Sequence, residues 1–330
     1  MWRDNRRALT KESVLAKNTE WQQSAIALDK TGVLSRRQIA EVIGVARSTC
    51  LDFLRNYGKF KEGGVKEQKE KVEGITHLYI PDSQVKPGVS LEYLRWIGEY
   101  IVRKQPDVII HAGDFADMEG LSTYDKGKKS AEGKRVQLDI DAAIKGMETL
   151  LTPLRCLQAR QIVEGQKVYE PRMVITLGNH EDRINRHVEA NPELHGFLSV
   201  DNLRYKEFGW EVVPFLTPIN IHGINYCHYF PNVMTGKPLS GSAMNMLKTI
   251  GESFTMGHRQ TLDVTTRFLP TSGKQQFGLI AGAAYTHEEA YKGKQGNHHW
   301  RGIIVKHNVK EGAYDPLFIS LDWLESEYGQ

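Results

Sequence analysis

Apolar residues recur with two different periods along this chain, and the change of period divides it. Over residues 9–31, and again over 36–43 and 47–55, the apolar positions follow helical spacing. From Thr76 onward, short β-branched runs alternate with amphipathic stretches, which is typical of strands joined by helices. The sequence therefore predicts a small all-α domain followed by a larger α/β domain.

The larger part is predicted to begin with three strands and three helices in alternation. The strands are expected at 77–80, 108–112 and 174–177, and the helices at 91–104, roughly 136–160 and 181–188. More strands are expected at 223–230, 253–256, 278–285, 301–309 and 317–321, of which the last closes the sheet.

A charged stretch separates the two parts. Residues 59–74 alternate Lys and Glu around Gly63-Gly64, a composition that cannot bury a hydrophobic core. We interpret it as a solvated linker. The expected domains are therefore residues 1–58, which are helical, and residues 75–330, which are α/β.

Residues 35–55 have the pattern of a helix-turn-helix unit. Ser35 is a suitable N-cap, Gly44 is a natural helix end, and the second helix begins after a short turn. The pattern resembles small DNA-reading domains, in which the second helix contacts base edges and flanking cations contact phosphates. The DNA-binding candidates are Arg47, Ser48 and Thr49 for bases and Arg36, Arg37 and Arg55 for phosphates. The alternative is a helical hairpin that docks a protein partner or the chain's own second domain.

Composition limits the classes of function. A hydrophobic share of 40% and a charged share of 25% over 330 residues are ordinary for a globular protein. The net charge of +3 does not by itself imply a polyanionic partner, so a nucleic-acid argument depends on local features such as the basic loop 126–134. The three cysteines, Cys50, Cys156 and Cys227, are widely spaced, which argues against a disulfide framework or a thiolate zinc site. No apolar run or signal-peptide core is found, so we expect no membrane partner and a cytoplasmic location, in the host cytoplasm if the chain is phage-encoded.

Several of the predicted strands end in side chains that bind metal ions. The set mixes carboxylate, amide and imidazole donors, which suit Mn, Fe, Zn or Mg better than a thiolate-seeking metal. Asp114 could bridge two ions, and two ions about 3.5 to 4 Å apart polarise a phosphoryl group and generate a hydroxide nucleophile near neutral pH. The set is Asp82, Gln84, Asp114, Asp117, Asn179, His180, His228, His258 and Gln260.

The order and spacing of these residues over 76 to about 262 resemble the calcineurin-like metallophosphoesterases. The matching blocks are Asp82-x-Gln84, Gly113-Asp114-x-x-Asp117, Gly178-Asn179-His180-Glu181, His228 and Gly257-His258-x-Gln260. The resemblance implies a double β-sheet sandwich flanked by helices, with the metals at the strand ends.

The resemblance also implies a role for each matching residue. One ion would be held by Asp114, Asn179, His228 and His258, and a second by Asp82, Gln84, Gln260 and the shared Asp114. His180 would lie beside the phosphate, where it stabilises the transition state or protonates the leaving oxygen, and Asp117 would orient its ring. Arg183 is a candidate phosphate clamp, with a solvated helix arginine as the alternative.

The sequence departs from the family at one of the two ions. The family has His where Gln84 and Gln260 stand, and a neutral amide oxygen is a weaker and harder ligand than imidazole. We therefore expect two divalent ions, of which the second is bound more weakly. Manganese is expected first, with magnesium, iron and zinc as alternatives.

Three functions are compatible with these features. The first is a metal-dependent phosphodiesterase, a nuclease to which the N-terminal helices bring DNA. The second is a phosphomonoesterase for a nucleotide or a phosphoprotein, with a recruiting N-terminal domain. The third is a DNA-binding protein whose phosphoesterase domain binds metal without turnover. Cleavage of a polymer separates the first from the second, and any metal-dependent turnover separates both from the third.

Overall fold

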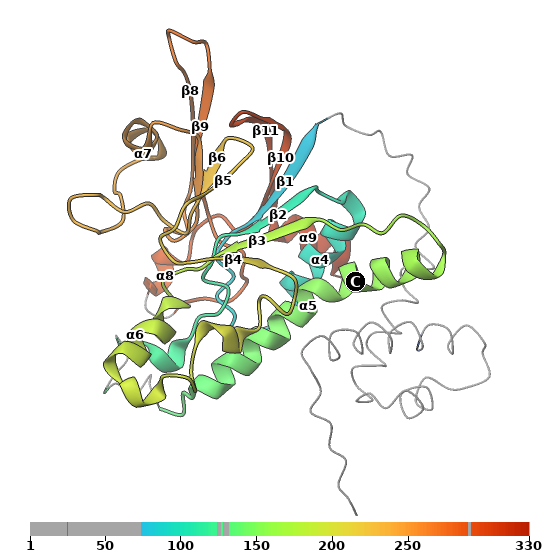
Figure 1. The fold of residues 1–330 in the computed structure, drawn as a ribbon, viewed down its shortest axis with the longest axis vertical. Coiled ribbons are helices and arrows are strands. Elements are labelled where there is room, and N and C mark those ends of the chain that lie inside the picture. Colours follow the sequence, from blue (N-terminus) through green and yellow to red (C-terminus); the bar gives the residue numbers. More distant parts are fainter. Residues whose placement is uncertain (1–24, 26–73, 124–126, 128–131, 290–291, 330) are drawn as a thin grey trace, which may run out of the picture. The chain divides into compact units, whose positions relative to one another are not determined.

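The computed structural model describes residue 25 and residues 74–329, with gaps at 124–126, 128–131 and 290–291 (Figure 1). The predicted helix-turn-helix at 35–55 lies outside the described residues, and so do its DNA-binding candidates Arg36, Arg37, Arg47, Ser48, Thr49 and Arg55. Almost all of the linker and part of the basic loop 126–134 also lie outside them. Over the described residues the chain is α/β, as predicted, with two mixed sheets and six α-helices.

The first sheet has six strands in the order β11-β10-β1-β2-β3-β4. Neighbouring strands from β1 to β4 are parallel, and β10 and β11 add antiparallel pairs at the other side. The strands are β1 (Ile75–Ile80), β2 (Val108–His111), β3 (Arg172–Thr176), β4 (Glu211–Val213), β10 (Gly302–Lys310) and β11 (Ala313–Ser320). Three of them, β1 to β3, are the strands that the β-branched runs predict.

The second sheet has five strands in the order β5-β6-β7-β9-β8. They are β5 (Ile219–Ile221), β6 (Ile224–Tyr226), β7 (Phe254–Met256), β8 (Leu262–Phe268) and β9 (Gln275–Ala281). Both sheets contribute to one buried cluster, in which Tyr79 and Ile110 of the first sheet lie with Tyr226 and Leu279 of the second. The two sheets are therefore held together by a shared hydrophobic core.

Helices accompany both sheets. They are α4 (Glu92–Lys104), α5 (Val136–Val163), α6 (Asp182–Ala190), α7 (Ala243–Ile250), α8 (Gly293–Gly296) and α9 (Leu321–Tyr328). The helix α7 packs Met246 and Leu247 against Phe254 and Ile280 of the second sheet. The helices α4 and α9 lie together in Figure 1, and Arg95 donates a hydrogen bond of 2.8 Å to the carbonyl of Tyr328. None of the helices in the described part of the chain is long and apolar enough to cross a membrane.

The chain divides into two compact units, and the one with the strand ends comprises Glu70–Leu151 and Pro171–Gln330. Within it the sequence misses α7, for which no helix was expected. Ser242 caps this helix by accepting the backbone N–H of Asn245. The strands β4, β5 and β8 are also missed.

Candidate metal centre

Five strand ends place the predicted ligands. The strands β1, β2 and β3 are parallel neighbours, as are β6 and β7, so the carboxyl ends of each set lie at one edge. Each ligand follows its strand by two or three residues, in a loop that the strand fixes. They are Asp82 after β1, Asp114 after β2, Asn179 after β3, His228 after β6 and His258 after β7.

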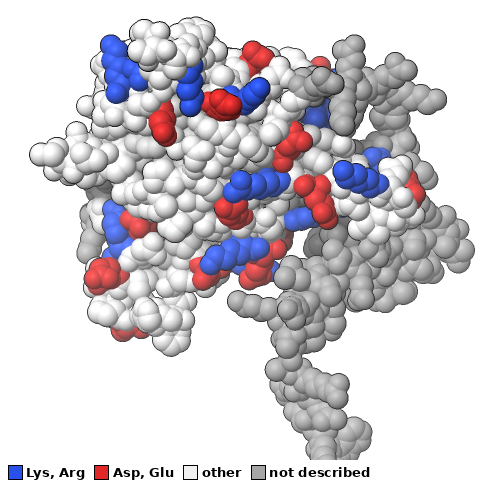
Figure 2. All heavy atoms as spheres, turned by 45° about the horizontal axis from the view of Figure 1, so that its top comes forward, with Lys and Arg blue, Asp and Glu red and all other residues white. Residues whose placement is uncertain are grey.

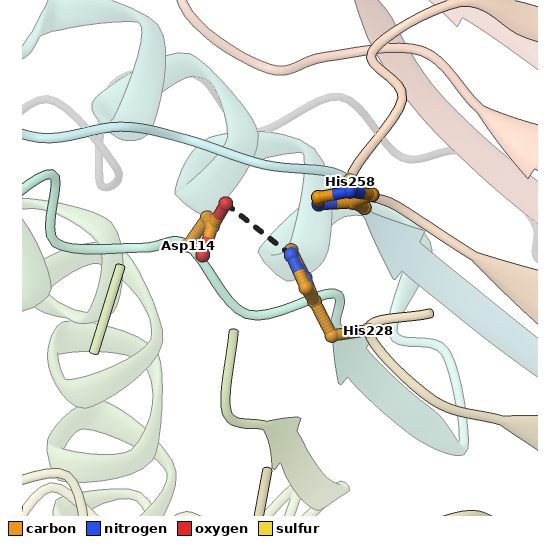
Figure 3. Close-up of side chains that lie close together, drawn as sticks. All are labelled: Asp114, His228 and His258. Atoms are coloured by element: carbon orange, nitrogen blue, oxygen red, sulfur yellow. Dashed lines mark ion pairs between the residues drawn. The ribbon is translucent and has the colours of Figure 1, made fainter. Parts of the chain in front are cut away.

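Four of these side chains converge. The Oδ1 atom of Asn179 lies 3.0 Å from Nε2 of His228 and 2.8 Å from Nδ1 of His258. Nε2 of His228 also lies 3.3 Å from Oδ2 of Asp114. Figure 3 shows Asp114, His228 and His258 on three separate loops with their polar ends turned toward one another, and one donor atom from each lies within 4.8 Å of the others. The structure thus brings together the four residues expected around the first ion.

The hydrogen atoms on His228 can be assigned from its partners. Its Nδ1 lies 2.8 Å from the carbonyl oxygen of Ala112, which can only accept, so Nδ1 carries the hydrogen. In the neutral ring the lone pair of Nε2 then faces the acceptor oxygens of Asn179 and Asp114. Lone pairs that face one another at hydrogen-bond distance need a proton or a metal ion between them, and this set of nitrogen and oxygen donors fits a divalent metal ion.

The electrostatics of the site favour positive charge. Burial opposes ionisation of His228, but the Asp114 carboxylate raises the pKa of that imidazole to about 9. Burial also acts against ionised Asp114, yet the neighbouring His180 and His228 lower the pKa of its carboxyl group. The same attraction that holds a proton on His228 would hold a metal cation in its place.

The local backbone explains the glycines of the motifs. A Cβ on Gly178 would lie 2.0 Å from Oδ1 of Asp114, and a Cβ on Gly257 would lie 2.1 Å from Oδ1 of Asp82. Only glycine permits these approaches. Asp114 and His258 themselves have φ of 47° and 64°, a left-handed conformation that is uncommon for residues with a side chain and that clusters at functional sites.

His180 lies at the edge of this group, with 8% of its surface exposed. Its Nδ1 is 2.7 Å from Oδ1 of Asp117 and 2.9 Å from the Asp117 carbonyl oxygen. Nδ1 therefore carries the hydrogen, and in the neutral ring Nε2 carries the lone pair. Burial acts to lower the pKa of His180, but Asp114 and Asp117 raise it above its ordinary value. The structure thus pairs His180 and Asp117 as expected, and the backbone N–H of His180 donates to Asp114 at 2.8 Å.

Arg183 is not a solvated helix arginine. It donates to the carbonyl oxygen of Asp117 at 2.8 Å, and a second guanidinium nitrogen lies 3.3 Å from Nε2 of His180. Its side chain is only 16% exposed. The guanidinium group therefore lies beside Nε2 of His180.

The residues expected around the second ion, Asp82, Gln84 and Gln260, differ in the contacts that they make. Gln84 is fully buried, and neither atom of its amide has a hydrogen-bond partner among the described residues. Both carboxylate oxygens of Asp82 accept the backbone N–H of His258 at 3.0 Å, and burial raises the Asp82 pKa to about 7. The Oε1 atom of Gln260 instead accepts hydrogen bonds from Tyr285 and Lys292.

Two phage proteins are similar to this chain. The Gene 54 protein of Mycobacterium phage L5 is 25% identical over 204 residues, which cover 60% of this chain and 74% of the phage protein. The Gene 54 protein of Mycobacterium phage D29 is 24% identical over 186 residues, which cover 55% of this chain and 67% of the phage protein. No protein-family model matches the chain.

Sequence reasoning missed the role of Glu181, which it interpreted only as an acid in the first turn of a helix. One of its carboxylate oxygens accepts the N–H groups of Asp114 and Gly178, both at 2.9 Å. The other accepts those of Phe115 at 2.8 Å and Ala116 at 3.1 Å. Glu181 therefore joins the two loops that carry Asp114 and Asn179. The only sequence feature that could have indicated this role is the position of Glu181 directly after Asn179-His180.

A second acidic group beside the site already holds a cation. Asp117, Glu119 and Glu289 lie close together, and the ammonium group of Lys86 is 3.5, 3.0 and 2.9 Å from them. Burial opposes the charge of Lys86, but these carboxylates raise the pKa of its ammonium group. Lys86 thus offsets part of the negative charge of this group and contacts Asp117, the partner of His180. No sequence motif pointed to Lys86.

Proposed function

We propose that this chain is a divalent-metal-dependent phosphoesterase of the calcineurin-like type. The leading hypothesis for its activity is a phosphodiesterase that cleaves DNA. The observation that carries the proposal is the convergence of Asp114, Asn179, His228 and His258 with lone pairs facing one another. When bound there, a divalent ion supplies Lewis acidity that polarises a phosphoryl oxygen and acidifies water. Manganese suits the mixed oxygen and nitrogen donors, with magnesium, iron and zinc as alternatives.

The protein groups around the metal centre support hydrolysis of a phosphate ester. The guanidinium of Arg183 and the imidazole of His180 can both donate to a phosphoryl oxygen, which stabilises the charge that develops in the transition state. A protonated Nε2 of His180 can also give its proton to the leaving oxygen. Asp117 keeps the ring in the tautomer that turns Nε2 outward.

The choice of DNA as substrate rests on the helix-turn-helix pattern at 35–55, and the similarity to two mycobacteriophage proteins bears only on the origin of the chain. On the face shown in Figure 2, Lys and Arg alternate with Asp and Glu and form no broad basic surface. Affinity for a polyanion is therefore assigned to the N-terminal arginines and to the loop 126–134. If the chain is phage-encoded, as these relatives favour, it acts in the host cytoplasm.

Cleavage assays test the proposal. Labelled single- and double-stranded DNA is incubated with added Mn²⁺ and the wild-type protein, the Asp114→Ala variant or the Asp201→Ala control, which changes an exposed acid. We expect cleavage by the wild type and the control, and a loss of roughly 10³-fold or more in Asp114→Ala. Turnover of a simple phosphomonoester without DNA cleavage would identify a phosphatase, and no turnover of either would identify a non-catalytic DNA-binding protein.

A further inference from the structure

The side chain of Lys292, at the start of α8, reaches the second expected ligand set. Its ammonium group donates to Oε1 of Gln260 and, at 2.8 Å, to the hydroxyl of Tyr285, and it lies 5.5 Å from the centre of the Tyr285 ring. The Tyr285 hydroxyl donates to the same Gln260 oxygen at 2.8 Å. A carbonyl oxygen has two lone pairs, so both lone pairs of Gln260 are engaged.

Backbone pairing places this group next to Asp82. The segment before Tyr285 runs alongside Asp82: Ala283 forms a parallel bridge with it, and the N–H of Ala284 donates to its carbonyl oxygen at 2.8 Å. Burial lowers the pKa of the Lys292 ammonium group, and the carboxylates of Glu289 and Asp82 act in the opposite direction. The ammonium group of Lys292 and the carboxylate of Asp82 therefore attract each other electrostatically.

These contacts leave few donors for a second ion. Gln260 is engaged by Lys292 and Tyr285, and the Asp82 carboxylate already accepts the N–H of His258. Gln84 contributes a neutral amide. An ammonium group and a divalent cation in the same space repel each other, and a neutral amide is a suitable acceptor for the ammonium. The amide groups of Gln84 and Gln260 are therefore better suited to accept hydrogen bonds from a lysine than to bind a second metal ion.

We propose that the ammonium group of Lys292 takes the place of the second divalent ion, so that this centre binds one metal through Asp114, Asn179, His228 and His258. The inference rests on the proposed function and concerns how its phosphate ester is held. Lysine carries three donors and a localised charge, which suit the non-bridging oxygens of a phosphate.

Counting bound metal tests this inference independently of activity. Metal-free full-length protein is equilibrated with saturating Mn²⁺, and bound manganese per chain is measured by elemental analysis. Electron paramagnetic resonance then distinguishes an isolated ion from an exchange-coupled pair. We expect one ion and an uncoupled spectrum. Two coupled ions in the wild type would overturn the inference and leave the phosphoesterase proposal standing, whereas no bound ion would overturn both.

Variants separate the effect of the lysine from that of weak ligands. The change Gln84→His with Gln260→His restores imidazoles but keeps Lys292, and we expect it still to bind one ion. Adding Lys292→Met should raise the count to two with a coupled spectrum, whereas adding Lys294→Met, an exposed lysine of the same helix, should not. A coupled pair in the protein that keeps Lys292 would contradict the inference. If a variant fails to fold, a coupled pair of ions in the wild type would still overturn the inference.

Discussion

At the scale of single residues, the arrangement of the site depends on which ring nitrogen of each histidine already has a hydrogen-bond partner. His180 has its Nδ1 directed at Asp117, which leaves Nε2 for other partners, and His228 has its Nδ1 directed at Ala112 with the same result. Nε2 of His228 faces the oxygens of Asn179 and Asp114, and Nε2 of His180 lies beside Arg183. In the proposed mechanism, the surroundings of Nε2 thus distinguish the histidine ligand from the proton donor.

The separate roles of these two histidines predict different effects of substitution. His180→Ala should lower kcat by about 10²- to 10⁴-fold, because general acid catalysis and phosphate contact are lost together. Bound manganese should stay at the wild-type level, since His180 is not assigned as a ligand. Elemental analysis and initial rates measure both quantities, with the exposed His195→Ala as control. Loss of manganese from the His180 variant would contradict the assigned role.

At the scale of elements, the loops after β2 and β3 are joined to each other through one side chain. Glu181, at the start of α6, accepts N–H groups from Asp114, Phe115 and Ala116 of one loop and from Gly178 of the other. The side chain is fully buried, and the Tyr205 hydroxyl also donates to it at 3.1 Å. The position of Asp114 therefore depends on a residue that is assigned no contact with metal or substrate.

Replacing this carboxylate tests how strongly the two loops depend on it. Glu181→Gln directs an amide NH₂ at backbone N–H groups, which leaves buried donors without an acceptor and should lower the free energy of unfolding by about 2 to 4 kcal/mol. Urea denaturation measures the change, with the exposed Glu189→Gln of the same helix as reference. We also expect weaker manganese binding, because Asp114 is no longer held. An unchanged unfolding midpoint would show that other contacts fix the loops.

At the scale of the whole site-bearing unit, a charged side chain lies in the core that joins the two sheets. Lys306 of β10 is fully buried, with its ammonium group 4.4, 4.8 and 5.4 Å from the ring centres of Tyr226, Tyr314 and Tyr79. It donates to the hydroxyls of Thr255 and Tyr226, both in the second sheet. Burial lowers the pKa of Lys306 well below its ordinary value.

This pKa shift predicts that stability changes with pH. Below the unfolded pKa of lysine, about 10.4, the unfolded chain binds a proton that the folded chain binds less readily, so the free energy of unfolding falls as pH falls. The slope from this group approaches about 1.4 kcal/mol per pH unit. Lys306→Met should remove that slope and stabilise the protein at pH 7 by about 1 to 3 kcal/mol. Lys310→Met, which changes an exposed lysine of the same strand, should leave the slope unchanged.

Denaturation at a series of pH values between 6 and 10 measures this prediction. If the slope is the same in wild type and Lys306→Met, the lysine stays protonated in the folded state. The three tyrosine rings would then hold the ammonium group by cation–π attraction, which offsets the effect of burial.

The sequence by itself predicted most elements of the α/β part. Its β-branched runs and amphipathic stretches indicate strands joined by helices, and parallel strands bring their ends together. The assignment of Asp114, Asn179, His228 and His258 to one ion follows from the resemblance to the calcineurin-like metallophosphoesterases, and the structure brings these four side chains together. The strands β4, β5 and β8 escaped detection. Local chemistry along the chain was sufficient wherever a motif and its strand were adjacent.

Only the tertiary structure decided which polar groups engage one another across distant segments. Lys292 and Tyr285 reach Gln260, Lys86 reaches Glu289, and Lys306 lies between two sheets. None of these pairings has a periodic signal, because each is set by the packing of segments that are not neighbours in either sheet order or sequence. A buried charged side chain is stable only when a polar or oppositely charged group lies beside it. Which group lies beside each lysine depends on how distant segments pack, so the tertiary structure decides it.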